Sequence, residues 1–489
     1  MKNDLAQLRT DIGQIYSKLK AAAQQGQKII AQVHPHQKRS ATNLIHYLAL
    51  RREDLRPLQD DLHDAGLSSL ASSESHILRQ VQAVLLRLGV KIPKKDISGS
   101  DATAGTQLLH RRANDLFGRK EYPGIPHLMV TFDTPLADDF ATVKALVNAG
   151  MNIARINCAH DGPGVWQRMV DNVRKAENAT GRTCKIYLDL AGPKIRTQLL
   201  GKGRRKGRLK LEEQEVFYLA ESHARFNKKD KVLGCSLPGV VKDLRAGNRV
   251  LFDDGLFEAR VETPGRQIAT LRMVRISAAK PRLKPEKGIN FPDTALSVRC
   301  LTDYDRSVLP FAQEHADLLG FSFVRSAADV ADLQALLRKK GGNRLPIVLK
   351  IETAEAVQNL PALLLQGMAE PAFGVMIARG DLAVEIGFER LSEIQEEILW
   401  LCEAAHVPVV WATQVLETLN KSGIATRSEL SDAVRAAQAE CVMLNKGKHL
   451  LTVLATLRDI LHRSGGHHLK KRYVFRPLKI AKRFLDNME

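Results

Sequence analysis

The chain has 489 residues, of which 44% are hydrophobic and 26% are charged, and its formal net charge is +19. These values exclude a chain that is disordered throughout, and no apolar run reaches the ~18 residues that a membrane-spanning helix needs. The polar amino terminus lacks a signal-peptide core, and the cysteines show no metal-binding or disulfide spacing. We therefore expect a cytoplasmic protein with reduced thiols, whose basic surface fits a nucleic-acid partner or a small anionic substrate.

The amino-terminal part is predicted to be helical. One series of apolar residues alternates steps of three and four over residues 5–19, and a second does so over residues 44–62. Ser73 is predicted to cap a third helix, which ends at Gly89. Both series are short and lie on either side of His34–His36, which favours a small bundle over an intermolecular coiled coil. A polar linker with room for one helix follows at 91–118.

From about residue 127, short apolar runs alternate with amphipathic stretches. Eight runs are predicted strands: His127–Phe132, Asn152–Cys158, Lys185–Leu190, Ala316–Phe323, Pro346–Glu352, Phe373–Ala378, Val407–Thr413 and Cys441–Asn445. Helical patterns follow most of them, as at Leu136–Asn148, Ala327–Lys340 and Leu391–Ala405. Because buried strands that alternate with helices form parallel sheets, eight such units predict an α/β fold, a closed (β/α)8 TIM barrel.

A long interval separates the third predicted strand from the fourth. Its turns and β-type residues give four strand candidates: Val216–Leu219, Arg249–Phe252, Glu258–Val261 and Thr270–Arg275. Thr302–Ala316 then supplies the helix that the third unit lacks. We predict an inserted, β-barrel-like lid domain. The predicted organisation is a helical extension with its linker at 1–120, a barrel at 121–193 and 284–465, a lid at 194–283, and a basic tail at 466–489.

Polar residues follow the predicted strands where a barrel enzyme carries its catalytic groups. They are Arg155, Asn157, Asp189, Ser322, Arg325, Lys350, Glu352, Ala378–Asp381, Thr413–Gln414 and Asn445–Lys446. A solvated strand end explains any one of them, but convergence of all of them on one mouth favours an active site.

Residue types at these strand ends suggest phosphoryl transfer. Glu352 and Asp381 supply carboxylates suited to Mg²⁺. Cations are placed around them: Arg155, Arg196, Arg325 and Lys350. Phosphoryl transfer depends mostly on positioning and charge neutralisation, which such a set provides. Gly380 and Asp381 open a helix-like turn whose free N–H groups could hold a carboxylate.

Nine segments resemble the pyruvate kinase family, in the family's order, over about residues 127–445. They are Met151–Asn157, Leu188–Thr197, Phe252–Gly255, Lys287–Pro292, Phe321–Arg325, Lys350–Glu352, Ala378–Ile386, Ala412–Glu417 and Thr426–Glu429. The resemblance implies the barrel with its lid, and Mg²⁺-dependent transfer from phosphoenolpyruvate to ADP that gives pyruvate and ATP. Mn²⁺ could replace Mg²⁺, and a homo-oligomer stays open. The family's C-terminal domain is expected to be absent, and the helical extension has no counterpart in the family's usual form.

The resemblance also implies roles for individual residues. Lys350 would neutralise the transferred phosphoryl group, while Glu352 and Asp381 would hold the metal. Substrate binding falls to Ser322, Ala378, Arg379, Gly380, Asp381 and Thr413, with Thr413 near the carbon that is protonated. Phosphate or nucleotide binding falls to Arg155, Arg196 and His160, and a monovalent-cation site to Asn157, Asp189 and Lys194. Asp254 would reach down from the lid when it closes.

The sequence departs from the family's pattern at four places. Thr131–Pro135 replaces a loop that helps to bind the nucleotide, and Asn445–Lys448 replaces a segment of the proton-delivery network. Ala159 stands where the family has a serine that ligates K⁺, and Lys194 stands where it commonly has glutamate. We expect the Lys194 ammonium to take the place of the cation, with Asp189 as its partner, so that K⁺ is not required.

Three other functions remain as alternatives. A non-kinase barrel lyase could use Mg²⁺ and an enolpyruvate but would not need Lys350 or a lid. An inactive scaffold is consistent with the altered Thr131–Pro135 loop. Nucleic-acid binding is suggested by the basic runs at Lys202–Lys210 and Lys470–Arg483, but neither contains a recognised binding motif, so we do not expect a nucleic-acid partner.

Overall fold

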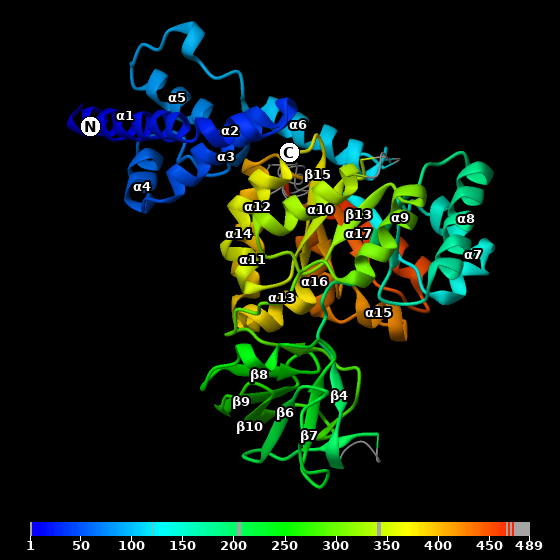
Figure 1. The fold of residues 1–489 in the computed structure, drawn as a ribbon. Coiled ribbons are helices and arrows are strands. Elements are labelled where there is room, and N and C mark those ends of the chain that lie inside the picture. The colour runs from blue at the N-terminus through cyan, green and yellow to red at the C-terminus, as the bar shows by residue number, and fades with distance from the viewer. Residues whose placement is uncertain are drawn as a thin grey trace, which may run out of the picture.

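The computed structural model describes residues 2–120, 122–202, 207–339, 344–465, 468–469 and 472–473. Figure 1 shows a helical region at one end, a barrel surrounded by helices in the middle, and a β-sheet domain at the far end. Most of the predicted basic tail at 466–489 lies outside the described residues, which there include only the short strands β18 (His468–Leu469) and β19 (Arg472–Tyr473). None of the helices described is both long enough and apolar enough to cross a membrane.

Eight parallel strands form a closed barrel in the order β1-β17-β16-β15-β14-β13-β3-β2. Their bounds are β1 His127–Thr131, β2 Ile153–Asn157, β3 Lys185–Asp189, β13 Leu318–Phe321, β14 Ile347–Ile351, β15 Phe373–Ala378, β16 Val409–Ala412 and β17 Cys441–Leu444. Each lies within one of the eight predicted runs, so the predicted (β/α)8 barrel is confirmed. The runs are apolar on both faces because one face fills the barrel and the other packs against the outer helices.

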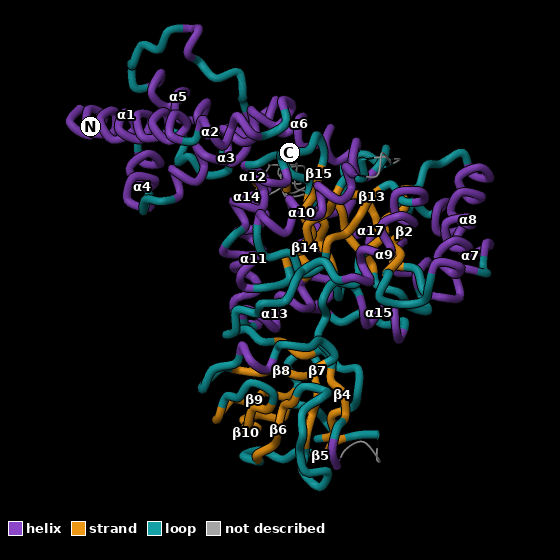
Figure 2. Tube along the Cα trace, viewed as in Figure 1, coloured by secondary structure: helices purple, strands orange, loops and turns teal. Residues whose placement is uncertain are grey.

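The outer helices occupy the predicted positions between these strands, as Figure 2 shows. They are α7 Phe140–Asn148, α8 Pro163–Thr180, α9 Asp303–His315, α10 Ala327–Lys339, α11 Ala354–Gln358, α12 Leu360–Gly367, α13 Arg379–Ile386, α14 Leu391–Ala404, α15 Glu417–Ser422, α16 Arg427–Arg435 and α17 Leu450–Gly465. The predicted helix at Leu136–Asn148 is shorter than expected, because a 3-10 turn at Thr134–Ala137 precedes α7. At α9, Thr302 and Asp305 form a capping box, which explains why the helix begins there.

The amino-terminal end of the barrel is closed by α6 (Ala102–Phe117), the helix for which the predicted linker left room. Its residues Ala113, Leu116 and Phe117 share one core cluster with inward-facing barrel residues such as Tyr187 and Met376. This end of α6 is therefore a plug of the barrel interior. The substrate-facing end must be the opposite one, where the strands reach their carboxyl ends.

The amino-terminal helices form a bundle within one chain, as predicted. They are α1 Lys2–Gln25, α2 Gln27–Gln32, α3 Lys38–Arg51, α4 Arg56–Asp64 and α5 Ile77–Arg87. Helix α1 packs against both α3 and α5, and its stripe at Leu8, Ile12 and Leu19 is buried. The stripe therefore has partners in its own chain, which removes the reason for an intermolecular coiled coil.

Two predictions for this bundle are wrong in detail. The second apolar series is divided between α3 and α4, because the chain turns at Arg52–Leu55 before Pro57, which begins the next helix well but cannot continue the previous one. Ser73 does not cap α5, since the 3-10 turn Glu74–His76 intervenes and α5 begins at Ile77.

Asn43 fixes the bundle to the barrel. Its side-chain amide nitrogen donates to the carbonyl oxygens of Glu74 (2.7 Å) and Ala404 (2.8 Å). Its amide oxygen accepts the N–H of Ile77 at 3.1 Å. Nearby, the Ser40 hydroxyl lies 3.0 Å from His406 Nδ1. Asn43 is only 5% exposed, and its bonds to Ala404 and Ile77 are buried, so these groups lack water as an alternative partner.

An Asn43→Ala variant is expected to unfold with a free energy lower by about 3 kcal/mol, because three backbone groups lose a partner and two of these bonds are buried. Chemical denaturation followed by circular dichroism measures this change. The half-buried neighbour Thr42, whose hydroxyl bonds within its own helix, supplies the control variant Thr42→Ala. Equal stability of the two variants would contradict the docking role of Asn43.

The inserted lid is a seven-stranded sheet in the order β12-β8-β9-β10-β6-β7-β4, beside a two-stranded sheet of β5 and β11. The bounds are β4 Thr197–Leu199, β5 Leu209–Lys210, β6 Val216–Ala220, β7 Val232–Cys235, β8 Arg249–Phe252, β9 Phe257–Thr263, β10 Ile268–Ile276, β11 Arg282–Leu283 and β12 Ile289–Asn290. All four strand candidates are confirmed. The lid extends beyond the expected residue 283, because β12 pairs with β8.

Candidate active site

A cavity of about 440 Å³ lies at the carboxyl ends of the barrel strands, on the side that faces the lid. Most of the predicted site residues line it: Arg155, Asn157, His160, Lys194, Arg196, Ser322, Lys350, Glu352, Ala378, Asp381 and Thr413. Three residues that the sequence did not indicate also line it: Tyr304, Met376 and Met443. Most of the predicted strand-end residues therefore lie at one mouth, whereas Arg325, Gln414 and Asn445–Lys446 do not line this cavity.

Asp189 is the buried centre of the charge network, just behind the cavity wall. Two N–H groups of Arg155 donate to its Oδ2, at 2.9 and 2.6 Å, and a third reaches Thr131 Oγ1 at 2.9 Å. The Lys350 ammonium lies 3.3 Å from its Oδ1. Burial disfavours the charged carboxylate, but Lys350 and Arg155 outweigh burial and hold the pKa of Asp189 below its usual value.

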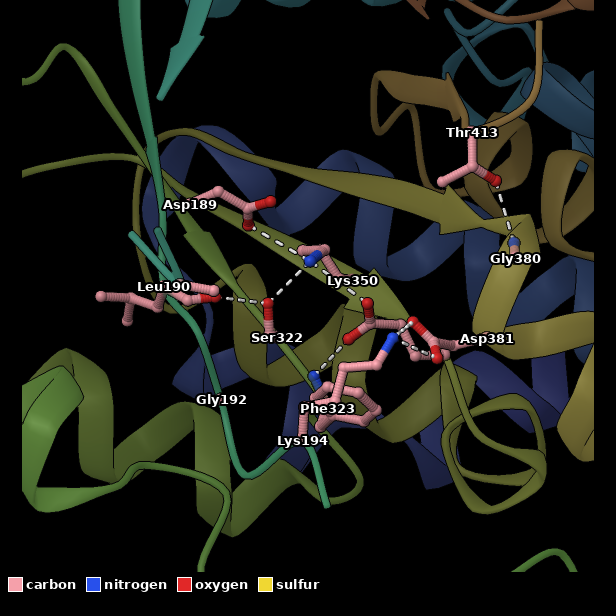
Figure 3. A network of polar contacts seen from close by, with 12 residues as sticks. Asp189, Leu190, Gly192, Lys194, Ser322, Phe323, Lys350, Gly380, Asp381 and Thr413 are labelled. Carbon is pink, nitrogen blue, oxygen red and sulfur yellow. Dashed lines mark hydrogen bonds and ion pairs between the residues drawn. The ribbon is translucent and has the colours of Figure 1, made fainter. Parts of the chain in front are cut away.

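Lys350 is fixed from three sides (Figure 3). Its ammonium donates to Ser322 Oγ at 2.7 Å and lies 3.2 Å from Glu352 Oε1. Ser322 in turn donates to the carbonyl of Leu190, so the hydroxyl must accept from the lysine. Burial lowers the pKa of Lys350, but Asp189 and Glu352 more than compensate, so the pKa is raised and the side chain stays an ammonium.

Glu352 and Asp381 are the candidate metal ligands. Glu352 Oε2 accepts the Phe323 N–H at 2.6 Å, which leaves Oε1 toward Lys350. Burial raises the pKa of Glu352, Asp381 adds to the rise and Lys350 opposes it. Among the described residues no group of three His, Cys, Asp or Glu side chains is arranged to hold a metal ion. Two carboxylates in one cavity fit Mg²⁺, which keeps water and substrate oxygens as its other ligands.

The turn from β15 into α13 meets Thr413 from the next strand. The Gly380 N–H, which was expected to be free, donates to Thr413 Oγ1 at 2.9 Å. Thr413 and Gln414 have φ values of 66° and 57°, a left-handed conformation that is rare for a β-branched residue. Such strain is found where a side chain is held for function.

Arg379, predicted to bind substrate, does not line the cavity. Its Nε donates to the Ala412 carbonyl at 3.0 Å, a second nitrogen bonds Asp432, and the guanidinium lies 4.7 Å from the Trp411 ring centre. Arg325 is also directed elsewhere, because it donates to the carbonyls of Leu296 and Val298. Both arginines donate to nearby backbone carbonyls. The predicted ring of cations therefore lacks Arg325.

Two phosphate-binding candidates, Arg196 and His160, line the cavity. Arg196 Nη1 donates to the carbonyl of Glu286 at 3.0 Å. His160 is largely exposed. Partial burial of its ring, together with the positive charges of Lys446 and Arg196, lowers its pKa. Asn157 Oδ1 accepts the N–H of Ala159 at 3.0 Å.

Two expected positions differ in this structure. Lys194 pairs with Asp381, at 2.8 and 3.0 Å from its two oxygens, and not with Asp189, whose oxygens face Arg155 and Lys350. Asp254 does not line the cavity. It lies in a lid turn beside Asp253, whose carboxylate pairs with Lys287 at 2.8 Å.

A family model described as the barrel domain of pyruvate kinase matches residues 128–448. The chain belongs to the pyruvate kinase family. It is similar to pyruvate kinases from Geobacillus stearothermophilus, with 31% identity over 68% of this chain and 55% of the relative, and from Thermotoga maritima, with 30% identity over 67% of this chain and 68% of the relative. It therefore spans about half the length of some curated relatives and about two thirds of others.

The fold is also similar to that of a solved pyruvate kinase from Cryptosporidium parvum. The two chains superpose with a TM-score of 0.63 at 24% identity, over 72% of each chain. This likeness supports the barrel with its inserted sheet as the pyruvate kinase architecture.

Proposed function

We propose that this protein transfers the phosphoryl group of phosphoenolpyruvate to ADP in a Mg²⁺-dependent reaction that gives pyruvate and ATP. The observation that carries the proposal is the Lys350 ammonium, which is held between Asp189 and Glu352 at the mouth of the barrel, in the same cavity as Asp381. A fixed cation beside two metal-binding carboxylates neutralises the charge that spreads over a transferring phosphoryl group.

The proposed roles of the other residues follow from their positions around the Lys350 ammonium. Glu352 and Asp381 would hold the metal, which supplies charge neutralisation and orientation when bound. Arg155, fixed by Asp189, and Arg196 at the rim would bind phosphate oxygens. The turn at Ala378–Asp381 would bind the substrate carboxylate, next to Thr413.

The test is an assay of the purified chain with phosphoenolpyruvate, ADP and Mg²⁺ that follows pyruvate directly. We expect pyruvate and ATP in equal amounts, and no reaction with EDTA or without ADP. Pyruvate formed without ADP would favour a lyase or a phosphatase. No product at all, from a folded chain that binds Mn²⁺, would favour the inactive scaffold to which the altered Thr131–Pro135 loop points.

We also propose that the reaction does not need K⁺. Ala159 supplies no hydroxyl to ligate a monovalent cation, and the Lys194 ammonium already lines the cavity together with Asn157. A tethered ammonium can supply the positive charge of a dissolved cation.

Turnover in a buffer free of K⁺ and NH₄⁺ is expected to rise less than twofold when KCl is added at constant ionic strength. A rise of tenfold or more would contradict K⁺ independence. In a Lys194→Glu variant we expect turnover to fall sharply, with only partial recovery in KCl because Ala159 still cannot ligate the ion.

A further inference from the structure

The Lys194–Asp381 ion pair joins the lid to the candidate metal site (Figure 3). Lys194 lies in the segment 190–196 that leads from β3 into the lid, whereas Asp381 lies in the first turn of α13 on the barrel. The ammonium contacts both carboxylate oxygens, at 2.8 and 3.0 Å. These are the same two oxygens that Asp381 would offer to a divalent cation.

Each carboxylate at the site has a cationic partner without a metal ion. The three carboxylates of the cluster are paired with three cations: Asp189 with Arg155, Glu352 with Lys350, and Asp381 with Lys194. A divalent cation would therefore enter a site whose carboxylates are already paired. It gains most if one of the resident cations moves away, because like charges at close range repel.

Lys194 is the resident cation that can leave. The side chains of Arg155 and Lys350 are 11% and 9% exposed, and each has at least two partners. The Lys194 side chain is 31% exposed. Within the described part of the chain its ammonium bonds to Asp381 alone.

There is also space for this ammonium to move. Lys194 and Asp381 line the active-site cavity and, on their other side, a second cavity of about 330 Å³ between the base of the lid and the barrel. Phe323 lines both cavities as well. A lysine that releases Asp381 therefore remains next to open space and needs no rearrangement of the barrel.

We propose that Lys194 is a tethered counter-ion of Asp381, which competes with the divalent cation for this carboxylate and is released when the cation binds. The inference rests on the proposed metal site. Because Lys194 belongs to the segment that carries the lid, cation binding removes one of the contacts that hold the lid to α13. Another is the hydrogen bond from Asn290 to Glu385, at 2.9 Å. Metal binding and lid movement are thereby coupled through one side chain.

The experiment measures Mn²⁺ binding to the full chain, without phosphoenolpyruvate or nucleotide, from the electron paramagnetic resonance signal of free Mn²⁺. Lys194→Met is expected to bind Mn²⁺ at least tenfold more tightly than the wild type, because the competing charge is gone. Lys194→Arg keeps the charge and is expected to stay within threefold of the wild type. Lys231→Met is the matched control, since Lys231 pairs with Glu215 within the lid and is similarly buried.

Wild-type affinity in Lys194→Met would overturn the inference, provided that Asp381→Asn weakens Mn²⁺ binding. If Asp381→Asn binds as the wild type does, the metal site itself is wrong and the proposed function fails with it. Acetylation of lysines by acetic anhydride, read by mass spectrometry, gives a second measurement on the wild type. Mg²⁺ is expected to increase labelling of Lys194 at least threefold and to leave Lys231 unchanged; unchanged labelling of Lys194 would also overturn the inference.

Discussion

A Lys350→Met enzyme is expected to lose at least about a thousandfold in turnover, because Lys350 is the cation that, among the described residues, lies between Glu352 and Asp189. The chain should still fold. Asp189 keeps Arg155 as its partner, whereas Glu352 loses the charge that opposes the rise of its pKa and becomes easier to protonate. We expect a stability loss of about 3 kcal/mol, typical of removing one partner from a buried ion pair.

Turnover of phosphoenolpyruvate and the denaturation midpoint are measured on the same preparation. Lys185→Met is the matched control, because Lys185 begins β3 at the opposite end of the barrel and pairs with Asp317 at 3.2 Å. That variant should keep nearly all of the activity. More than a tenth of the wild-type rate in Lys350→Met would show that the lysine is not the cation on which transfer depends.

The barrel could be predicted from the sequence because its signal is local and repeated. Each strand is a short run that is buried on both faces, and each is separated from the next by an amphipathic helix or by the lid. The boundaries at Thr134–Ala137 and at β12 could not be predicted from the sequence. A 3-10 turn and a two-residue strand have too few residues to produce a periodic pattern.

Side-chain partners were predicted less well than side-chain positions. Arg325 and Arg379 stand at strand ends as expected, but an arginine also binds backbone carbonyls, and which acceptor it reaches depends on loops distant in sequence. Lys194 was expected to pair with Asp189 because Asp189 belongs to the predicted monovalent-cation site, where the ammonium would replace the ion. Asp189 already faces Arg155 and Lys350 from two other strands, so the lysine pairs with Asp381, 187 residues further along the chain.

The packing of residues 91–118 also could not be predicted from the sequence. Their polar composition predicts a linker, yet Ala113, Leu116 and Phe117 are buried. Three apolar residues on one helix are too few to indicate a core by themselves. These residues form part of a core only because they pack against Tyr187 and Met376 at the open end of the barrel.

The importance of Gly320 could not be predicted from the apolar pattern of its strand. It lies at the centre of β13, and a Cβ atom there would overlap Tyr187 Oη and Asp189 Oδ1. Both neighbours are fully buried, at 0% and 1% exposure, so neither can swing into solvent. The absence of a side chain at Gly320 is therefore what allows Asp189 to reach Arg155 and Lys350 from the adjacent strand.

A Gly320→Ala variant is expected to lose at least about a hundredfold in turnover, because displacing Asp189 by even 1 Å moves the two cations that it positions. Overpacking should also lower the free energy of unfolding by about 2 to 3 kcal/mol. Gly164→Ala in α8 is the control, since a Cβ atom there meets nothing within 4 Å and alanine suits a helix better than glycine. We expect the control to be as active as the wild type and slightly more stable. If Gly320→Ala kept full activity, the carboxylate of Asp189 would not be the group that holds Arg155 and Lys350 in place.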